Sequence, residues 1–500
     1  MKFWIPIGKP LLKRLLILGA LVAVITVALV ILAVFYGWSH FAQSLAPLDP
    51  WHKEYPQAEF TASDETAGYD FDDYLKQEGD VFDELNAFIE GPWKPAATGT
   101  YCRFNPASVS YPTALFDRNW NRTFLKEAEN PIGGALLIHG LSDSPYSMRA
   151  TGERLSAAGY TVLLLRVPGH GTCPAALAKV DAGDWRAAVR VAARGLREKL
   201  PPDAPLVVMG FSNGGALSVN YAIEALNDES LPNVSALVLM SPMIGITPLA
   251  KITRYHHWIA AASGDARANW SAVQAAIDPY KYASWPMNAS VQAWRMTQRV
   301  EEGLAQLEKA GRMGEFPPVL TCQSAIDATV KVALLMSSLY GRVVDNGSEL
   351  MVFDVNRVGW MESLINLDFE KALEPAFRSH DLTYDLTVVT NASPDSEQAI
   401  AKTRDGEDVR KVSLNLSWPD NIYSLAHAAV PFEENDPIYG AAGKGVDTRL
   451  PLGSMDFKGE AGVLRISSSQ IVRLRHNPFF PYMAERQVEW LSATLGGKVD

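Results

Sequence analysis

The stretch Leu206–Gly215, which reads LVVMGFSNGG, decides the fold of this 500-residue chain. Its four leading apolar residues predict a buried strand and the run from Asn213 predicts a helix, so the pattern G-x-S-x-G lies in the turn between them. A serine hydroxyl is a poor nucleophile unless it is exposed and held beside a base. A sharp strand-to-helix turn exposes it, and flanking glycines relieve the crowding of that turn. The stretch therefore predicts that Ser212 is a catalytic nucleophile.

Short apolar runs alternate with helical segments around this turn. The expected strands are Gly133–Ile138, Thr161–Leu165, Leu206–Met209 and Ser235–Met240, and the expected helices are Met148–Ala158, Asp184–Leu200 and Asn213–Leu226. Continuous apolar strands that alternate with helices indicate a mostly parallel sheet covered on both faces, the α/β class. Ligands of such sheets bind at the carboxyl ends of the strands, where His139, Ser212 and Ser241 are expected.

Three motifs occur together at these strand ends: His139-Gly140-Leu141, Pro168–Thr172 (PGHGT) and Gly210–Gly214 (GFSNG). On these residues, the segment from about 133 to 240 resembles the first half of an α/β-hydrolase. The similar branch includes monoglyceride lipases, bacterial carboxylesterases and serine aminopeptidase-like hydrolases. The resemblance implies the chain order nucleophile, acid, base, and an oxyanion hole made by the backbone N–H groups of Leu141 and Asn213.

The acid of a triad is expected beyond the apolar run Phe316–Cys322. Asp327 follows this run and precedes a helix expected over Val330–Tyr340. The family usually has an Asp closely followed by a Val at this place, so the resemblance assigns Asp327 as the acid. Aspartate is also a common helix N-cap, and the two roles are compatible.

The base is expected to be a histidine on a loop after the last core strand. His427 lies in a loop of small residues, Tyr423–Phe432. This loop and the downstream segment Asn435–Gly440 resemble the His loop of a membrane-anchored or lipid-directed subgroup of bacterial α/β-hydrolases. His380 stands in a charged stretch typical of solvated surface, and His476 precedes the final helix. We therefore expect His427 to be the base.

A helical lid is expected at about 243–316, between the fourth strand and the run that leads to Asp327. Lids of this fold are inserted here, and their apolar inner face shapes the acyl pocket and excludes water. The segment is rich in aromatic residues, most of them expected in the core of the lid: Tyr255, Trp258, Trp270, Tyr280, Tyr282, Trp285 and Trp294.

A second insertion is expected at about 356–419, because the gap between acid and base is unusually long. It contains two strand-like runs, Tyr384–Thr390 and Val409–Trp418, with a polar segment between them, Pro394–Thr403, that has a helical composition. This pattern predicts an additional small α/β unit on the catalytic face of the sheet.

The N-terminus carries an apolar, uncharged run, Leu15–Trp38, that is long enough to span a bilayer. Four cationic residues precede it and acidic residues follow it. The positive-inside rule therefore predicts a cytoplasmic segment 1–14, a membrane anchor 15–38 and an extracytoplasmic remainder, which would be periplasmic in a Gram-negative bacterium. A signal peptide cleaved near Ala46 is the alternative, although the apolar run is longer than signal peptides usually have.

Composition bounds the remaining possibilities. The net charge of −11 argues against nucleic-acid binding and against electrostatic adhesion to anionic lipid. Three cysteines are too few for a disulfide framework, although one pair could form. The chain has no phosphate loop and no zinc-ligand spacing, so neither a cofactor nor a metal is expected. We expect a pre-domain segment at 39–130 and a hydrolase domain at 131–500; the oligomeric state is not predicted.

Three functions compete at this point. The first is hydrolysis of hydrophobic or lipid-like carboxylic esters through Ser212, His427 and Asp327. The second keeps this machinery but cleaves peptides, because proline-type aminopeptidases share the fold branch. The third is a non-catalytic binding protein on the same fold, since folds are often reused. The intact order of the three residues favours an enzyme, and the anchor and apolar lid favour esters.

Overall fold

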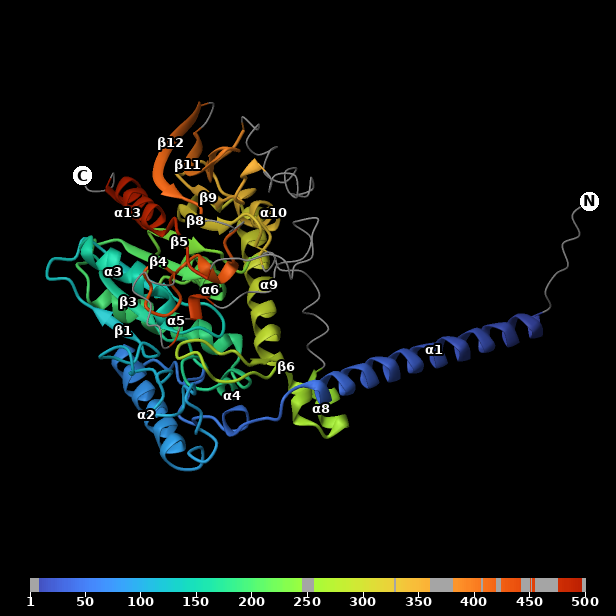
Figure 1. Ribbon diagram of the computed structural model, residues 1–500. Coiled ribbons are helices and arrows are strands. Elements are labelled where there is room, and N and C mark those ends of the chain that lie inside the picture. Colours follow the sequence, from blue (N-terminus) through green and yellow to red (C-terminus); the bar gives the residue numbers. More distant parts are fainter. Residues whose placement is uncertain are drawn as a thin grey trace, which may run out of the picture.

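Within the described residues, ten strands form one sheet in the order β1-β3-β2-β4-β5-β8-β9-β10-β11-β12 (Figure 1). The computed structural model describes residues 9–244, 256–327, 330–359, 381–405, 408–419, 424–441, 450, 452–454 and 475–496. The strands of the main sheet are β1 Phe124–Lys126, β2 Gly134–Ile138, β3 Thr161–Leu165, β4 Leu206–Phe211, β5 Ala236–Met240, β8 Val319–Ser324, β9 Glu349–Phe353, β10 Asp385–Ser393, β11 Ser396–Asp405 and β12 Asp408–Ser417.

The sheet is mostly parallel, as the sequence predicted. Strands β3 through β10 pair in parallel, whereas β1 at one edge and the hairpin β11–β12 at the other are antiparallel. Strands β2, β3, β4 and β5 are buried along their whole length, which explains their continuous apolar sequences. The four strands expected around the nucleophile turn are all present.

Helices cover both faces of this sheet. The helices are α1 Lys9–Ser44, α2 Phe71–Glu90, α3 Arg149–Ala157, α4 Pro174–Leu177, α5 Ala182–Glu198, α6 Asn213–Ala225, α8 His256–Ser263, α9 Met287–Lys309, α10 Val332–Leu335 and α13 Phe480–Gly496. Leu136 and Ile138 of β2 pack in one apolar cluster with α5, α6 and α9. Ala135 and Leu137, on the opposite face of β2, pack in another cluster with α3 and α13. Each face of the sheet thus has its own core.

Short single turns and two small strands complete the described elements. The turns are η1 Pro50–His52, η2 Pro145–Met148, η3 Ala266–Asn269, η4 Met313–Glu315, η5 Met336–Tyr340, η6 His427–Ala429 and η7 Leu452–Ser454, and the strands are β6 Trp270–Ala272 and β7 Trp285–Pro286. Part of the expected lid, residues 245–255, lies outside the described residues. Trp270, Tyr280 and Tyr282 of that segment are buried, as expected for residues in the core of the lid.

The second insertion differs from the prediction in one element and in its placement: its described strands extend the main sheet instead of forming a unit on the catalytic face. Pro394–Thr403, expected to be helical, lies in the β10–β11 hairpin, and β11 pairs with both β10 and β12. Ala399 and Ala401 alternate into the core, so pairing and burial override the helical preference of the surrounding Glu, Gln and Lys residues. The described strands of the insertion continue the main sheet at its edge, because β10 pairs in parallel with β9. Residues 360–380 of the insertion are outside the described residues.

The segment before β1 packs against the helices that cover the main sheet. Helix α2 lies on α5, and the approach is so close that a Cβ atom on Gly195 would come within 2.2 Å of the Phe71 Cβ atom. A separate apolar cluster joins Trp51 and Phe104 of this segment to Cys173 of the core. All three cysteines are buried free thiols, and burial raises the pKa of Cys173 and Cys322 to about 12.

Helix α1 extends away from the body of the protein (Figure 1). Its part Leu16–Ser44 is long and apolar enough to cross a membrane, a test that an N-terminal signal sequence also passes. Large apolar side chains along it, such as Leu16, Ile31 and Leu32, are about 60% exposed or more, far above what a core helix would show.

Candidate active site

Ser212 lies in the sharp turn between β4 and α6. Its φ of +53° and ψ of −115° fall in a region that non-glycine residues rarely adopt. The neighbouring backbone holds this conformation: the Ser212 N–H donates to the Met240 carbonyl (2.9 Å), and the Met243 N–H donates to the Ser212 carbonyl (2.8 Å). The turn thus places the serine at the carboxyl end of the central strands, as predicted.

Glycine is required in this turn by close approach of the backbone. A Cβ atom on Gly210 would lie 2.2 Å from the Gly214 carbonyl oxygen. A Cβ atom on Gly214 would lie 2.0 Å from the Ile138 carbonyl oxygen at the end of β2. Both contacts are with backbone atoms, which cannot move aside as a flexible side chain could. The pattern G-x-S-x-G therefore reflects packing between α6, β4 and β2.

The structure brings Asp327 and His427 together although 100 residues separate them in the sequence. Nδ1 of His427 is hydrogen-bonded to Oδ2 of Asp327. The Asp327 side chain is fully buried, and it also accepts hydrogen bonds from Gln323 Nε2 (3.0 Å) and the Val330 N–H (2.9 Å). The carboxylate thereby fixes the imidazole with Nδ1 toward Asp327 and Nε2 on the opposite side of the ring.

The His427 ring lies beside the nucleophile turn. Its centroid is 5.3 Å from that of Phe211, the residue directly before Ser212. The loop that carries the histidine is tied to the acid loop, because Ser324 Oγ donates to the Leu425 carbonyl (3.0 Å). His380 lies outside the described residues. His476 is buried, and burial lowers its pKa.

The two expected oxyanion-hole residues follow neighbouring strands. Leu141 comes after β2, and Asn213 is the first residue of α6, where a helix leaves its N–H groups without intrahelical acceptors. The backbone hydrogen bonds found in the described turns and loops include none donated by either N–H group. Ser142, next to Leu141, has a φ of +64°, so this loop too is held in an uncommon conformation.

His139 supports the oxyanion loop and has no free ring nitrogen. The Val167 N–H donates to its Nε2 (3.1 Å), so Nδ1 carries the proton and donates it to the Gly140 carbonyl (2.8 Å). Burial, followed by the nearby His170, holds the pKa of His139 well below its usual range. A permanently neutral imidazole with both nitrogens engaged has a structural role.

Tyr282 links this loop to the Pro168–Thr172 turn. Its N–H donates to the Ser142 carbonyl (2.8 Å). Its hydroxyl accepts from the Thr172 N–H (2.8 Å) and donates to the Gly169 carbonyl (3.2 Å). One residue of the expected lid therefore bonds to both the loop of Leu141 and Ser142 and the Pro168–Thr172 turn.

Arg103, from the segment before the hydrolase core, completes this support. Its buried guanidinium donates to the carbonyls of Gly171 (3.2 Å) and Asp278 (3.3 Å), with longer contacts to the Lys281 carbonyl (3.4 Å) and Asn121 Oδ1 (3.5 Å). It also lies over the Tyr282 ring, 5.3 Å from the centroid. The pre-domain segment thus contributes directly to the geometry of the candidate site.

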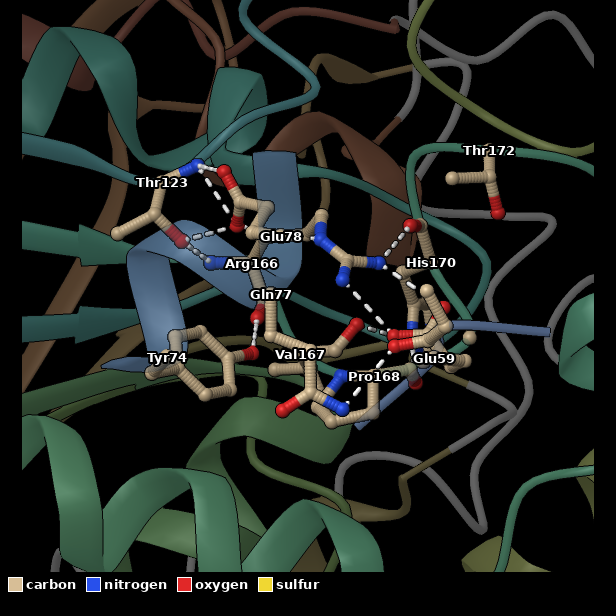
Figure 2. Close-up of polar contacts among 12 residues, drawn as sticks. Glu59, Tyr74, Gln77, Glu78, Thr123, Arg166, Val167, Pro168, His170 and Thr172 are labelled. Carbon is tan, nitrogen blue, oxygen red and sulfur yellow. Dashed lines mark hydrogen bonds and ion pairs between the residues drawn. The ribbon is translucent and has the colours of Figure 1, made fainter. Parts of the chain in front are cut away.

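A second buried arginine, Arg166, holds the Pro168–Thr172 turn. Figure 2 shows Arg166 between two carboxylates of the pre-domain segment, Glu59 (Nη2–Oε1 2.8 Å) and Glu78 (Nε–Oε2 3.2 Å). Its Nη1 donates to the His170 carbonyl (3.0 Å). Burial lowers the pKa of His170 to about 4, so this imidazole is neutral near neutral pH. Such a buried cluster is sensitive to loss of one partner, because a charge is then left uncompensated.

A cavity of about 170 Å³ lies next to the histidine loop. Its wall combines apolar and polar side chains: Gln274, Asp278, Lys281, Tyr282, Ala283, Ala428, Phe432, Tyr439 and Arg475. Ala428, which directly follows His427 in the sequence, and Phe432 are the residues of the histidine loop in this wall. Among the described residues, no group of three or more His, Cys, Asp and Glu side chains could hold a metal ion.

Sequence reasoning missed the residues that support the site. Arg103 and Tyr282 act on backbone groups far away in the chain, and no spacing in the sequence signals such contacts. Gln323 acts close by, because its Nε2 donates to Asp327, four residues further along the chain. Gln323 offered the only local signal, since it is a polar residue near the end of an apolar strand that leads to Asp327.

Comparison with known proteins supports the class of the molecule. Residues 129–333 match the family model described as serine aminopeptidase, S33. The thermostable monoacylglycerol lipase of Bacillus sp. (strain H-257) is 33% identical over 123 residues, which are 25% of this chain and 46% of the relative. The match therefore spans less than half the length of that relative.

Solved structures of lipolytic enzymes are also similar to this chain. A structure reported for the metagenome-derived lipolytic enzymes LipS and LipT has 23% identity and a TM-score of 0.37, and the alignment covers 52% of this chain and 98% of that chain. A soluble variant of the monoglyceride lipase from Saccharomyces cerevisiae has 17% identity and a TM-score of 0.35, and the alignment covers 46% of this chain and 82% of that chain.

The parallel sheet, the strand-to-helix turn at Ser212 and the matched segment together identify the chain as an α/β-hydrolase. The family model that this chain matches describes serine hydrolases, and the curated relative is also a serine hydrolase.

Proposed function

We propose that this protein is a membrane-anchored serine hydrolase that cleaves hydrophobic or lipid-like carboxylic esters. The observation that supports this most is the hydrogen bond between Asp327 and His427, with the imidazole packed beside the turn that carries Ser212. Asp327 and His427, which come from distant parts of the sequence, thereby meet beside the residue that precedes Ser212. Structural packing alone gives no reason for a buried carboxylate and an imidazole to meet beside a serine of positive φ.

In the proposed mechanism, Ser212 Oγ attacks the ester carbonyl while His427 Nε2 takes its proton. Asp327 keeps the imidazole in the tautomer that can accept this proton and stabilises the imidazolium that forms. The N–H groups of Leu141 and Asn213 stabilise the oxyanion of the tetrahedral intermediate. The carbon–oxygen bond to the alcohol then breaks, and the imidazolium protonates the leaving alcohol. Water, deprotonated by His427, hydrolyses the acyl-enzyme and regenerates the serine.

Three observations favour a lipid-like ester over a peptide. The curated relative at 33% identity is a monoacylglycerol lipase, and the first helix is apolar enough to hold the protein at a membrane. The cavity next to the histidine loop carries polar side chains, among them Gln274 and Lys281, suited to a polar head group on the leaving alcohol.

We infer a single-pass topology with the catalytic domain outside the cytoplasm. Lys2, Lys9, Lys13 and Arg14 precede the apolar run and would remain in the cytoplasm. The hydrolase domain would then lie on the far side of the membrane, in the periplasm of a Gram-negative cell.

A substrate panel tests the proposal. Detergent-solubilised full-length protein is assayed on short and long p-nitrophenyl esters, a monoacylglycerol and an aminoacyl amide, beside Ser212→Ala and the exposed control Ser230→Ala. We expect turnover of the esters, a loss of several orders of magnitude in Ser212→Ala, and an unchanged control. Preference for the aminoacyl amide would indicate a peptidase instead. Absence of turnover on every substrate would favour a binding protein.

A further inference from the structure

The C-terminal end of α1 is docked on the expected lid. Figure 1 shows α8 beside this end of the helix. Ala42 of α1 is fully buried against Ala260 and Ala268 of the lid segment, and Trp38 packs at the margin of this contact. Small side chains let the backbones approach closely, as they do between membrane helices. Trp38 Nε1 also donates to the Ala268 carbonyl (3.1 Å).

Arg267 of the lid segment caps α1 from outside the helix. Its Nη1 donates to the carbonyls of Gln43 (3.3 Å) and Leu45 (3.2 Å). The last carbonyls of a helix have no intrahelical partner, and a cation there complements the helix dipole. Asp265 holds the guanidinium in place through Nη2–Oδ2 (2.8 Å). The contact therefore combines apolar packing, a side-chain hydrogen bond and a charged cap.

The linker that follows α1 makes a second contact with the lid. The His52 ring packs edge-on against Trp270 at a centroid distance of 5.0 Å, and its Nε2 is hydrogen-bonded to Ser284 Oγ (2.9 Å). Both α1 and its linker thus hold the same segment, which extends from α8 to β7.

A bilayer-spanning α1 would bring the docked segment close to the membrane interface. Trp38, with Tyr36 and Phe41 nearby, is the kind of aromatic residue found at the lipid headgroups. With a rise of about 1.5 Å per residue, Ala42 lies roughly 6 Å beyond Trp38 along the helix. The headgroup layer on each side of a bilayer is roughly 5–8 Å thick. With α1 in a bilayer, helix α8 and η3 would therefore lie in or just above that layer.

The same segment leads directly to the candidate site. Residues 266–269 form η3, residues 270–272 form β6, and Gln274 and Asp278 line the cavity next to the histidine loop. Tyr282 then bonds to Ser142 of the oxyanion loop. Fewer than twenty residues connect the membrane contact to the reacting centre.

We propose that α1 and the α8–η3 segment form one docking unit that seats the lid in the outer headgroup layer, so that the enzyme takes esters resident in the bilayer rather than esters dissolved in water. This inference rests on the proposed function. It assigns Trp38 and Arg267 a role in delivering substrate, not in the chemical step. Helix α1 then holds the lid in position in addition to holding the protein at the membrane.

The test compares two substrates on the same proteoliposomes. Full-length protein in phosphatidylcholine vesicles is assayed with a monoacylglycerol embedded in the bilayer and with water-soluble p-nitrophenyl acetate. The variant combines Trp38→Ala and Arg267→Ala. The control is Arg295→Ala, whose ion pair with Asp181 is exposed and involves neither α1 nor the α8–η3 segment. We expect the variant to lose about tenfold or more on the embedded ester, because the local concentration of substrate at the site falls, and to keep its rate on the soluble ester.

Equal rates of the variant and the wild type on the embedded ester would overturn the inference. Failure of the wild type on both substrates would instead contradict the proposed function. If the variant loses both activities, a double cysteine variant, Ala42→Cys with Ala268→Cys, tests the docked arrangement. It should form a disulfide on mild oxidation and keep full activity on the embedded ester. Failure to cross-link, or loss of that activity once cross-linked, would show that the docked arrangement is not the working one.

Discussion

Replacement of Arg103 by methionine should destabilise the protein and slow catalysis together. The change keeps the aliphatic stem and removes a buried guanidinium that bonds to Gly171 and Asp278. The contacts at 3.4 and 3.5 Å are at the limit of hydrogen bonding and count for little. Two bonds from a charged donor contribute about 1.5–3 kcal/mol each. Allowing for the apolar burial of methionine, we expect a loss of about 4 kcal/mol in the free energy of unfolding.

The catalytic effect follows from the position of Arg103 over Tyr282. Without the guanidinium, Tyr282 and the Ser142 carbonyl that it holds are less restrained, and the Leu141 N–H moves with them. Removal of an oxyanion-hole donor costs roughly 100- to 1,000-fold in kcat, so displacement of one should cost about 10- to 100-fold, with KM nearly unchanged. Urea unfolding in detergent gives the stability, and steady-state kinetics on a soluble ester give kcat and KM.

The matched control is Arg118→Met, an exposed arginine of the same segment that lies over the Phe124 ring. The free energy of unfolding of this control should fall by no more than about 1 kcal/mol, as expected for an exposed cation–π contact. A lower stability with unchanged kcat in Arg103→Met would refute the positioning of the oxyanion loop. Unchanged stability as well would refute the reasoning about the guanidinium itself.

Further predictions concern the nucleophile turn, acid stability, the lid tyrosine and topology. Gly214→Ala should lower stability by about 3 kcal/mol or more and abolish ester hydrolysis, because its Cβ would overlap the Ile138 carbonyl; calorimetry and the ester assay measure both. Burial lowers the pKa of His52 and His170 to about 4, so the unfolded chain takes up protons first as the pH falls below about 6.5. The free energy of unfolding should therefore be unaffected by these histidines above that pH. It should fall by about 2 kcal/mol for each histidine between pH 7 and pH 5. Urea midpoints should show a shallower dependence in His170→Asn. Tyr282→Phe should reduce kcat by about tenfold at similar KM, because the Thr172 N–H loses its acceptor. A C-terminal alkaline phosphatase fusion should be active in a bacterial host, and an active cytoplasmic reporter there would contradict the orientation.

The predictable part of the fold is the part set by local pattern. Buried strands such as Thr161–Leu165 are continuous apolar runs, and the glycines at 210 and 214 mark a turn whose geometry only glycine permits. Strand β11 was not predictable, because its Glu, Gln, Ala and Lys residues favour a helix and its pairing partner β10 decides the outcome.

The residues of the candidate site also fall into those that the local sequence marks and those that only the tertiary structure brings together. Ser212 is marked by its own neighbours in the sequence, whereas the pairing of Asp327 with His427 depends on strands that fold far apart in the chain. Family order pointed to both residues, but their contact is a property of the tertiary structure. Arg103 bonds to backbone oxygens, which every residue carries, so no sequence pattern could reveal its role.

The central claim is that Ser212 is a nucleophile activated by His427 and Asp327. The most direct measurement is the rate of labelling by a fluorophosphonate, with the modified peptide located by mass spectrometry. We predict one adduct, on Ser212, in the wild type. In His427→Ala and Asp327→Asn, labelling should slow by about three orders of magnitude or more, because triad members act as a unit. An adduct on another serine, or labelling of Ser212 at the wild-type rate in His427→Ala, would contradict the account.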